Sequence, residues 1–302
     1  HEDVAPLIKE RHRALAVLDD GRKIYPLYEG KMFWHFDHRY GTYENQTEKQ
    51  ANKGVLPRVS DDQHLSADYN IQTRYWIDAG LTHEVLGEDA NNEWFFSWRD
   101  VGPSERTFVG TIVPKLAMGH ASPYLVSEAE ADDALAFSSI LSSLVVDYAV
   151  RQKSSRMTFF IVEQLPMLTK DLLQQPSDWL GEKPVSWINR RAIELYYTNW
   201  ELKALAESVG LDTPPFKWAP ARRSALQAEI DAAVMHLYGL DRKQADWILD
   251  SFTVLRKYEE RDHQEFRTKR LVLAAYDAMA DAKQQALQVA HILDRVEVGG
   301  DD

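Results

Sequence analysis

The segment HFDHR, residues 35–39, gathers three side chains that can bind a metal ion or take part in nuclease chemistry: His35, Asp37 and His38. In an extended strand, residues 35 and 37 share one face and residue 38 points to the other, so the three do not converge on one ion. The sequence has no cysteine and no His-x-x-x-His motif to complete a coordination shell. We therefore expect structural hydrogen bonds here, and no metal.

The segment RQKSSR carries a second possible chemistry, because Arg151, Lys153 and Arg156 follow one another closely in an otherwise acidic chain. No acidic residue lies between Asp147 and Glu163. An exposed loop of this kind can offer several donors to phosphates or to guanine edges. An ordinary solvated turn is the alternative, and the residues alone leave both open.

Four further cations are weaker candidates for DNA contact. Arg99 and Arg106 flank the turn DVGPSE, but acidic neighbours make local ion pairs at least as good an interpretation. Lys31 and Arg39 lie in the segment 26–44 beside acidic residues. For these two we favour a structural network, with contact to the DNA backbone as the alternative.

Catalytic motifs are missing from the sequence. Pro214–Pro215 follows Thr213 rather than Asp or Asn, so DTPPF is interpreted as a turn between helices and not as the adenine-binding turn of a methyltransferase. No G-x-G-x-x-G, Walker-type or G-x-S-x-G motif occurs. We expect no catalytic residue and no cofactor site in this chain.

The composition bounds the class of protein. Hydrophobic residues make up 44% and charged residues 27%, as in an ordinary globular protein, and the net charge of −12 confines any DNA-binding face to a local patch. The absence of cysteine excludes disulfides and fits a cytoplasmic location. No apolar run suits a membrane helix or a signal peptide, and the start at His1 rather than Met suggests a trimmed product.

These candidate residues must be positioned by an α+β fold in which a mixed, β-rich region precedes a helical one. We expect a linker helix at residues 1–20, an α/β domain at 21–170 and a helical region at 171–302. Aromatic and β-branched residues predict strands at 72–78, 93–100, 106–114 and 157–165, and a long loop is expected at 46–68. Apolar periodicity predicts helices at 7–18, 130–150, 186–210, 221–240 and 266–293, with Gly239 as a C-terminal stop and Asp241 as an N-cap.

Four segments resemble the C-terminal region of bacterial type IIG restriction–methylases and related adenine-specific DNA methyltransferases. They are PLYEGKMFWHFDHRYGTYE (26–44), WFFSWRDVGPSERTFVGTIVP (94–114), SLVVDYAVRQKSSRMTFFIVEQLPML (143–168) and the helical stretch from ELYYTNWELKALAESVG to RTKRLVLAAYD (194–277). They occur in the family's order and cover nearly the whole chain. The sequence departs from the family pattern at Trp34–His35 and at Ser154–Ser155–Arg156. Such departures are expected to change either the DNA sequence that is recognised or the conformation of the loop.

The resemblance implies a target recognition domain similar to the TaqI-like specificity domain. The parent protein is then expected to bind S-adenosylmethionine and to methylate adenine N6 in a restriction–modification or phage-defence system, with base flipping in a catalytic domain upstream. Double-stranded DNA is the expected partner, and no membrane is. With this resemblance, DNA contact becomes the favoured interpretation of Arg151, Lys153 and Arg156.

An alternative of another class is a helical protein–protein module that docks a catalytic or defence partner without touching DNA. The overall acidity favours this second interpretation, whereas the RQKSSR loop and the resemblance favour the first. Salt-dependent binding of duplex DNA discriminates between them.

Overall fold

The computed structural model describes residues 4, 7–12, 14–86, 93–177 and 179–285, and its fold class is α+β, as predicted. The chain forms two compact units that interleave along the sequence. Unit 1 comprises residues 1–100, 109–131 and 196–218, and unit 2 comprises residues 101–108, 132–195 and 219–302. The sequence predicts domains that follow one another along the chain, with boundaries at residues 20 and 170. In the structure, each unit consists of three separate segments of the chain.

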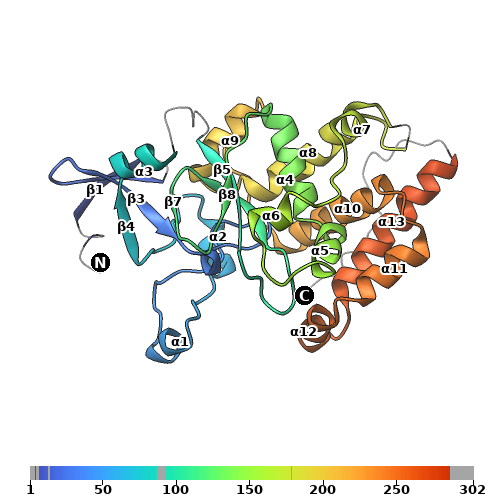
Figure 1. Cartoon of the computed structure of the whole chain (residues 1–302), viewed down its shortest axis with the longest axis horizontal. Coiled ribbons are helices and arrows are strands. Elements are labelled where there is room, and N and C mark those ends of the chain that lie inside the picture. The colour runs from blue at the N-terminus through green and yellow to red at the C-terminus, as the bar shows by residue number, and fades with distance from the viewer. Residues whose placement is uncertain (1–3, 5–6, 13, 87–92, 178, 286–302) are drawn as a thin grey trace. The chain divides into compact units, whose positions relative to one another are not determined.

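Unit 1 contains two sheets. In the first, β1 (Ile8–His12), β2 (Leu15–Leu18), β3 (Lys23–Tyr28) and β4 (Tyr75–Asp78) are antiparallel neighbours in that order, and β7 (Ala117–Met118) pairs with β3 in parallel (Figure 1). In the second, β5 (Trp94–Trp98) lies between β6 (Gly110–Pro114) and β8 (Tyr124–Leu125), antiparallel to both. The strands predicted at 72–78, 93–100 and 106–114 are therefore present, and the last begins only at Gly110.

The remaining elements of unit 1 are short. They are η2 (Gly30–Met32), α1 (Glu48–Asn52), α2 (Asp61–Leu65), α3 (Ala79–Leu86), η3 (Trp200–Leu202) and α9 (Lys203–Ser208). The long loop expected at 46–68 is wrong, because α1 and α2 lie within it. Thr47 and Ser60 each close a capping box with the glutamine three residues on, Gln50 and Gln63, a signal that was visible in the sequence.

The helix predicted at residues 7–18, and with it the linker helix of 1–20, is also wrong. The segment forms the β1–β2 hairpin, in which Ala14, Ala16 and Leu18 are buried. Ala16 and Leu18 lie two positions apart in β2 and pack with Ile24 of β3 on one face of the sheet, whereas Ala14 packs in another cluster with Tyr25 and Tyr28. The same apolar residues also fit helical spacing, and pairing with β3 decides between the two.

Unit 2 is helical. It contains α4 (Ala131–Leu141), α5 (Leu144–Arg151), α6 (Phe159–Val162), α7 (Lys170–Gln174), α8 (Pro184–Tyr196), α10 (Pro220–Leu237), α11 (Arg242–Asp250), α12 (Thr253–His263) and α13 (Arg267–Gln285). Helices α10 and α13 pack side by side, and α11 lies against α13 (Figure 1). Gly239 adopts a φ of 71° after α10 and Asp241 caps α11, which confirms both predicted helix boundaries.

Two predicted helices are interrupted. The stretch 130–150 bends by 57° between α4 and α5, where the side chain of Ser143 caps the second helix. The stretch 186–210 divides into α8, η3 and α9 because the side chain of Asn199 accepts a hydrogen bond from the amide of Glu201. Residues 286–293 of the predicted final helix lie outside the described residues.

The strand predicted at 157–165 is wrong. Amides of this segment donate to carbonyls three or four residues back, as Val162 does to Thr158 and Glu163 does to Phe159, and the helical turn α6 results. Within the described residues, no single helix has the length and apolarity to cross a membrane. The bent pair α4–α5 meets those criteria by length and composition alone.

Candidate nucleic-acid interface

The segment RQKSSR, residues 151–156, begins at the end of α5 and exposes two of its three cations to solvent. Lys153 and Arg156 are exposed, and no acidic residue lies between Asp147 and Glu163. The Lys153 ammonium donates to the carbonyl of Gln164 at 3.1 Å, and the backbone of Arg156 forms a β-bridge with Val101. The Lys153 side chain therefore contacts the backbone of its own segment, the Arg156 backbone is paired with Val101, and both residues keep exposed surface.

Arg151, the third cation, is turned toward its own unit. Its guanidinium donates to the hydroxyl of Thr107 and to the carbonyl of Ser251, each at 3.1 Å. It also lies 4.2 Å from the ring centre of Phe252 and 3.8 Å from the Asp147 carboxylate. Arg151 thus links segments of unit 2, whereas the sequence pattern does not distinguish it from Lys153 and Arg156.

Arg106 is held by a buried carboxylate. It forms an ion pair with Asp147, whose side chain is fully buried, and donates to the carbonyl of Ser142 at 3.1 Å. The same carboxylate accepts the amides of Thr107 and Phe108 at 3.0 and 3.3 Å. Since charged hydrogen bonds in a dry site are costly to leave unmade, Arg106 fixes the segment 101–108 against the helices.

In unit 1, Arg99 lies among aromatic rings. Its guanidinium donates to the carbonyl of Phe33 and lies 5.0 Å from the ring centre of Trp34 and 5.9 Å from that of Tyr40. Trp34 and Tyr40 stack on each other with centres 5.1 Å apart. Cation–π contact and the hydrogen bond together give Arg99 one fixed position in this cluster.

Lys31 is half-buried beside Glu29 and Tyr43. Its ammonium lies 3.2 Å from the Glu29 carboxylate and 5.1 Å from the centre of the Tyr43 ring. Burial lowers the pKa of Lys31, but the hydrogen bonds with Tyr43 and Glu29 outweigh it and raise the pKa overall. These local partners agree with the structural network that the sequence favoured.

Arg39 has no exposed surface at all. Its guanidinium donates to the carbonyls of Ser66 and Tyr69 at 3.0 Å each, of Thr198 at 3.1 Å and of His64 at 3.4 Å. A DNA contact is therefore ruled out for Arg39 in this fold. Its role is to join three segments of unit 1 that are distant in sequence.

The other charged residues of HFDHR pair in separate directions. The His38 imidazole lies 3.3 Å from the buried Glu201 carboxylate, and Asp37 lies 3.2 Å from His64. Burial lowers the pKa of His38. The ring of His64 stacks on Trp218 with centres 3.8 Å apart. Among the described residues, no three His, Cys, Asp or Glu side chains are placed to hold a metal ion.

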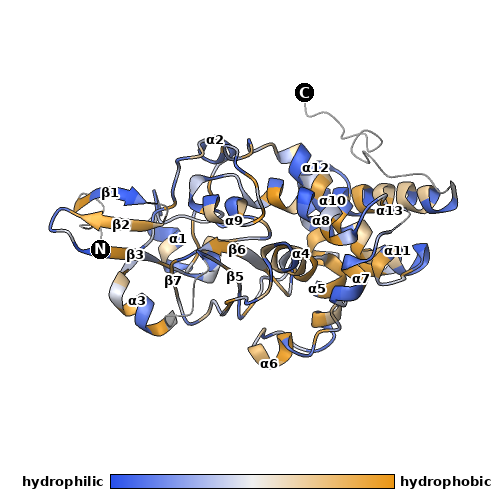
Figure 2. Ribbon diagram, turned by 90° about the horizontal axis from the view of Figure 1, so that it is seen from above, coloured by the Kyte–Doolittle hydropathy of each residue, from blue (hydrophilic) through white to orange (hydrophobic). Residues whose placement is uncertain are grey.

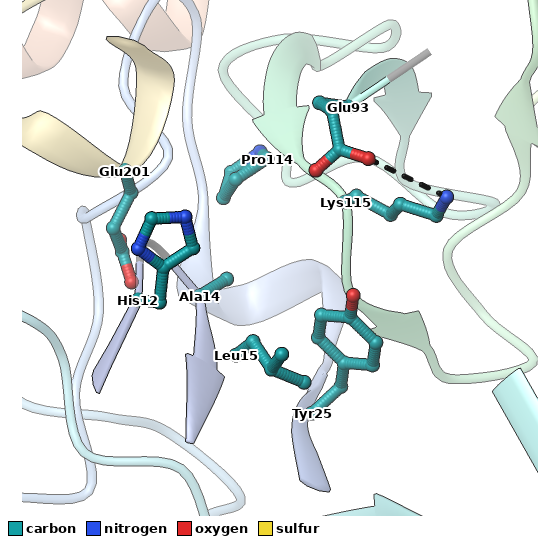
Figure 3. A pocket seen from close by; sticks show the side chains of 8 residues that line it. All are labelled: His12, Ala14, Leu15, Tyr25, Glu93, Pro114, Lys115 and Glu201. Atoms are coloured by element: carbon teal, nitrogen blue, oxygen red, sulfur yellow. Dashed lines mark ion pairs between the residues drawn. The ribbon is translucent and has the colours of Figure 1, made fainter. Parts of the chain in front are cut away.

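A small pocket of about 50 Å³ opens in unit 1 beside this network (Figure 3). His12 and Glu201 stand close together on one side of it, and the ion pair of Glu93 with Lys115, at 3.6 Å, stands on another. A volume of this size holds one or two water molecules. It is too small for a nucleobase or a cofactor, so we assign it no ligand.

The described residues do not form the glycine-rich turn that an S-adenosylmethionine site requires. In the described segments, no strand leads into a helix through a glycine-rich turn. Pro214 and Pro215 lie in the connection between α9 and α10, where the carbonyl of Thr213 accepts the Tyr197 hydroxyl at 3.0 Å.

Two large apolar residues of unit 2, which the sequence does not mark as candidates for binding, are exposed. Phe159 and Phe160 are 46% and 70% exposed, directly after the basic segment. A pair of large apolar residues between a basic loop and Pro166 was the available signal. The same residues belong to the segment 157–165, for which the sequence predicts a strand.

Comparisons of this chain with protein-family models, with curated proteins and with solved structures found no match.

Proposed function

We propose that this chain is the DNA sequence-recognition part of a site-specific adenine-N6 DNA methyltransferase of a restriction–modification or phage-defence system. Catalysis and S-adenosylmethionine binding belong to a domain upstream in the parent protein. The observation that carries the proposal is the pair of exposed cations, Lys153 and Arg156, on an anchored segment without acidic residues. The resemblance of four segments to type IIG enzymes supplies the reaction class.

The electrostatics of the chain restrict how DNA is held. With a net charge of −12, most of the surface repels phosphate, so binding depends on the local patch. Each phosphate that a cation neutralises adds about 0.9 to the slope of log affinity against log salt. Two exposed cations therefore account for a slope of about 2 in log affinity against log salt. So few phosphate contacts also predict that the chain by itself binds DNA weakly.

Fluorescence anisotropy of labelled duplex DNA at salt concentrations from about 50 to 200 mM tests the proposal. Because sequence-independent binding is weak, with dissociation constants of roughly 10⁻⁴ to 10⁻⁶ M, the titration extends to comparable protein concentrations. The variant Lys153→Ala/Arg156→Ala is expected to weaken binding and to lower the salt slope by about 2.

The matched control is Lys170→Ala/Arg190→Ala. It removes the same charge from exposed positions of unit 2, where Lys170 pairs with Asp133 at 2.6 Å and Arg190 pairs with Glu182. The control is expected to keep the wild-type slope. Absence of salt-dependent binding by the wild type, or equal slopes for the two double variants, overturns the proposal.

A second candidate function is a docking module for a catalytic or defence partner. The observation that favours it is Trp247 on α11, which is 62% exposed and meets Tyr148 of α5 edge-on with ring centres 5.4 Å apart. Exposed aromatic residues of this kind are enriched at protein interfaces. Failure of DNA binding together with capture of the upstream domain favours this function instead.

A further inference from the structure

The turn α6 directs its apolar residues in two opposite directions. Val162 is 8% exposed, and Met157 and Leu165 on either side of the turn are buried as well, whereas Phe159 and Phe160 face solvent. Figure 2 shows α6, coloured orange, at the end of a segment that extends away from α4 and α5. Two adjacent exposed phenylalanines on an anchored turn mark a binding surface rather than a packing error.

Hydrogen bonds order the backbone on both sides of Phe159 and Phe160. The Ser154 hydroxyl both donates to the carbonyl of Arg156 at 2.9 Å and accepts its amide at 3.0 Å. At the far end, the Tyr238 hydroxyl donates to the carbonyl of Pro166 at 2.7 Å. A pre-positioned aromatic side chain loses little conformational freedom when it binds, which favours insertion into a rigid partner.

The charge around the pair indicates the partner. Lys153 and Arg156 precede it, and the first acidic side chain, Glu163, follows α6. Cations beside an exposed apolar side chain match duplex DNA, in which phosphates flank a stack of apolar base faces. An apolar protein surface offers no counterpart for the two charges.

We propose that Phe160, supported by Phe159, inserts between stacked base pairs of duplex DNA while Lys153 and Arg156 hold the neighbouring phosphates. This inference rests on the proposed function and adds a mode of recognition to it. Insertion unstacks one base step and bends the duplex. It therefore favours DNA that is easily unstacked, either at a flexible step or at a mismatch, without any hydrogen bond to a base edge.

The test uses the whole 302-residue chain and two labelled duplexes of equal length, one fully paired and one with a single central mismatch. A 2-aminopurine beside the mismatch reports unstacking through its fluorescence. The wild type is expected to bind the mismatched duplex about tenfold more tightly and to raise the 2-aminopurine signal. Phe160→Ala is expected to lose both effects and to keep the salt slope of the wild type.

Two further variants control for unspecific damage. Phe160→Leu keeps an apolar wedge and is expected to recover much of the mismatch preference. Phe137→Ala removes a phenylalanine that is 36% exposed on α4, outside the segment 151–164, and is expected to behave as the wild type.

Failure of insertion and failure of the proposed function give different results. If the wild type shows no salt-dependent binding to either duplex, both the proposed function and the insertion of Phe160 are overturned. If the wild type binds both duplexes but Phe160→Ala matches it in mismatch preference and fluorescence, only insertion is overturned. Loss of the salt slope in Phe160→Ala also overturns it, because Phe160 then acts through the position of the cations.

Discussion

The guanidinium of Arg39 donates a hydrogen bond to the carbonyl of Thr198 at 3.1 Å, although the two residues are 159 positions apart. The bond joins the segment 26–44, one of the four that carry the resemblance, to the stretch 196–218, which also belongs to unit 1. The segment is therefore a structural centre of unit 1 rather than a contact surface.

Replacing Arg39 with Ala is expected to lower the free energy of unfolding by at least about 3 kcal/mol, because four carbonyls lose their donor, two of them in buried and two in partly buried hydrogen bonds. Arg39→Lys keeps the charge but cannot satisfy the same acceptors, so an intermediate loss is expected. Urea unfolding followed by circular dichroism measures both. The exposed Arg22→Ala serves as a control that leaves the transition in place. A stable Arg39→Ala variant would falsify the structural role.

Asp147 and Lys153 are expected to separate stability from DNA binding. Asp147→Ala removes the acceptor for Arg106 and for two amides, so a loss of about 3 kcal/mol in unfolding free energy is expected. Lys153→Ala leaves stability unchanged and weakens DNA binding. Thermal unfolding and anisotropy on both variants provide the comparison. The assignment fails if Lys153→Ala unfolds as readily as Asp147→Ala.

Two buried groups of α10 oppose each other in their pH dependence. Burial lowers the pKa of His236 to about 4, so unfolding, which restores a pKa near 6.5, becomes easier as the pH falls from 6.5 to 4. Burial raises the pKa of Asp231 to about 6, so the free energy of unfolding falls as the pH rises from about 4 to 6. Between pH 4 and 6 the two contributions offset each other.

Single substitutions are expected to expose each contribution. In Asp231→Asn, the amide oxygen can still accept the Leu144 amide, and the unfolding free energy should rise with pH relative to the wild type. In His236→Gln, the unfolding free energy should fall as the pH rises, relative to the wild type. Each slope approaches about 1.4 kcal/mol per pH unit, as one proton requires. Urea titrations at several pH values measure the slopes, and equal slopes in the two variants contradict the assignment.

Gly110 is required by the ring of Phe96 on the neighbouring strand. A Cβ atom at position 110 would overlap that ring, so Gly110→Ala is expected to cost about 1–3 kcal/mol in unfolding free energy. Phe96→Leu in the same chain makes room. The double variant is then expected to lose less than the sum of the two single losses, by about 1 kcal/mol. Simple additivity in chemical unfolding excludes the steric explanation.

Features that depend on near neighbours could be predicted from the amino-acid sequence. The α+β class followed from strand-like aromatic runs and helical periodicity, and the helix boundaries at Gly239 and Asp241 followed from backbone preference and local capping. The lack of acidic residues between Asp147 and Glu163 is likewise a property of the sequence. Each of these features depends on side chains within a few positions.

Long-range packing determines which of the seven candidate cations face solvent, and the sequence pattern does not predict it. Arg39 and Arg106 carry the same charge as Arg156, but carbonyls and a carboxylate brought from distant parts of the chain enclose them. The outward direction of Phe160 was decided in the same way, by the burial of Val162 and its neighbours. Burial depends on the sum of long-range contacts, and no short-range pattern in the sequence encodes that sum.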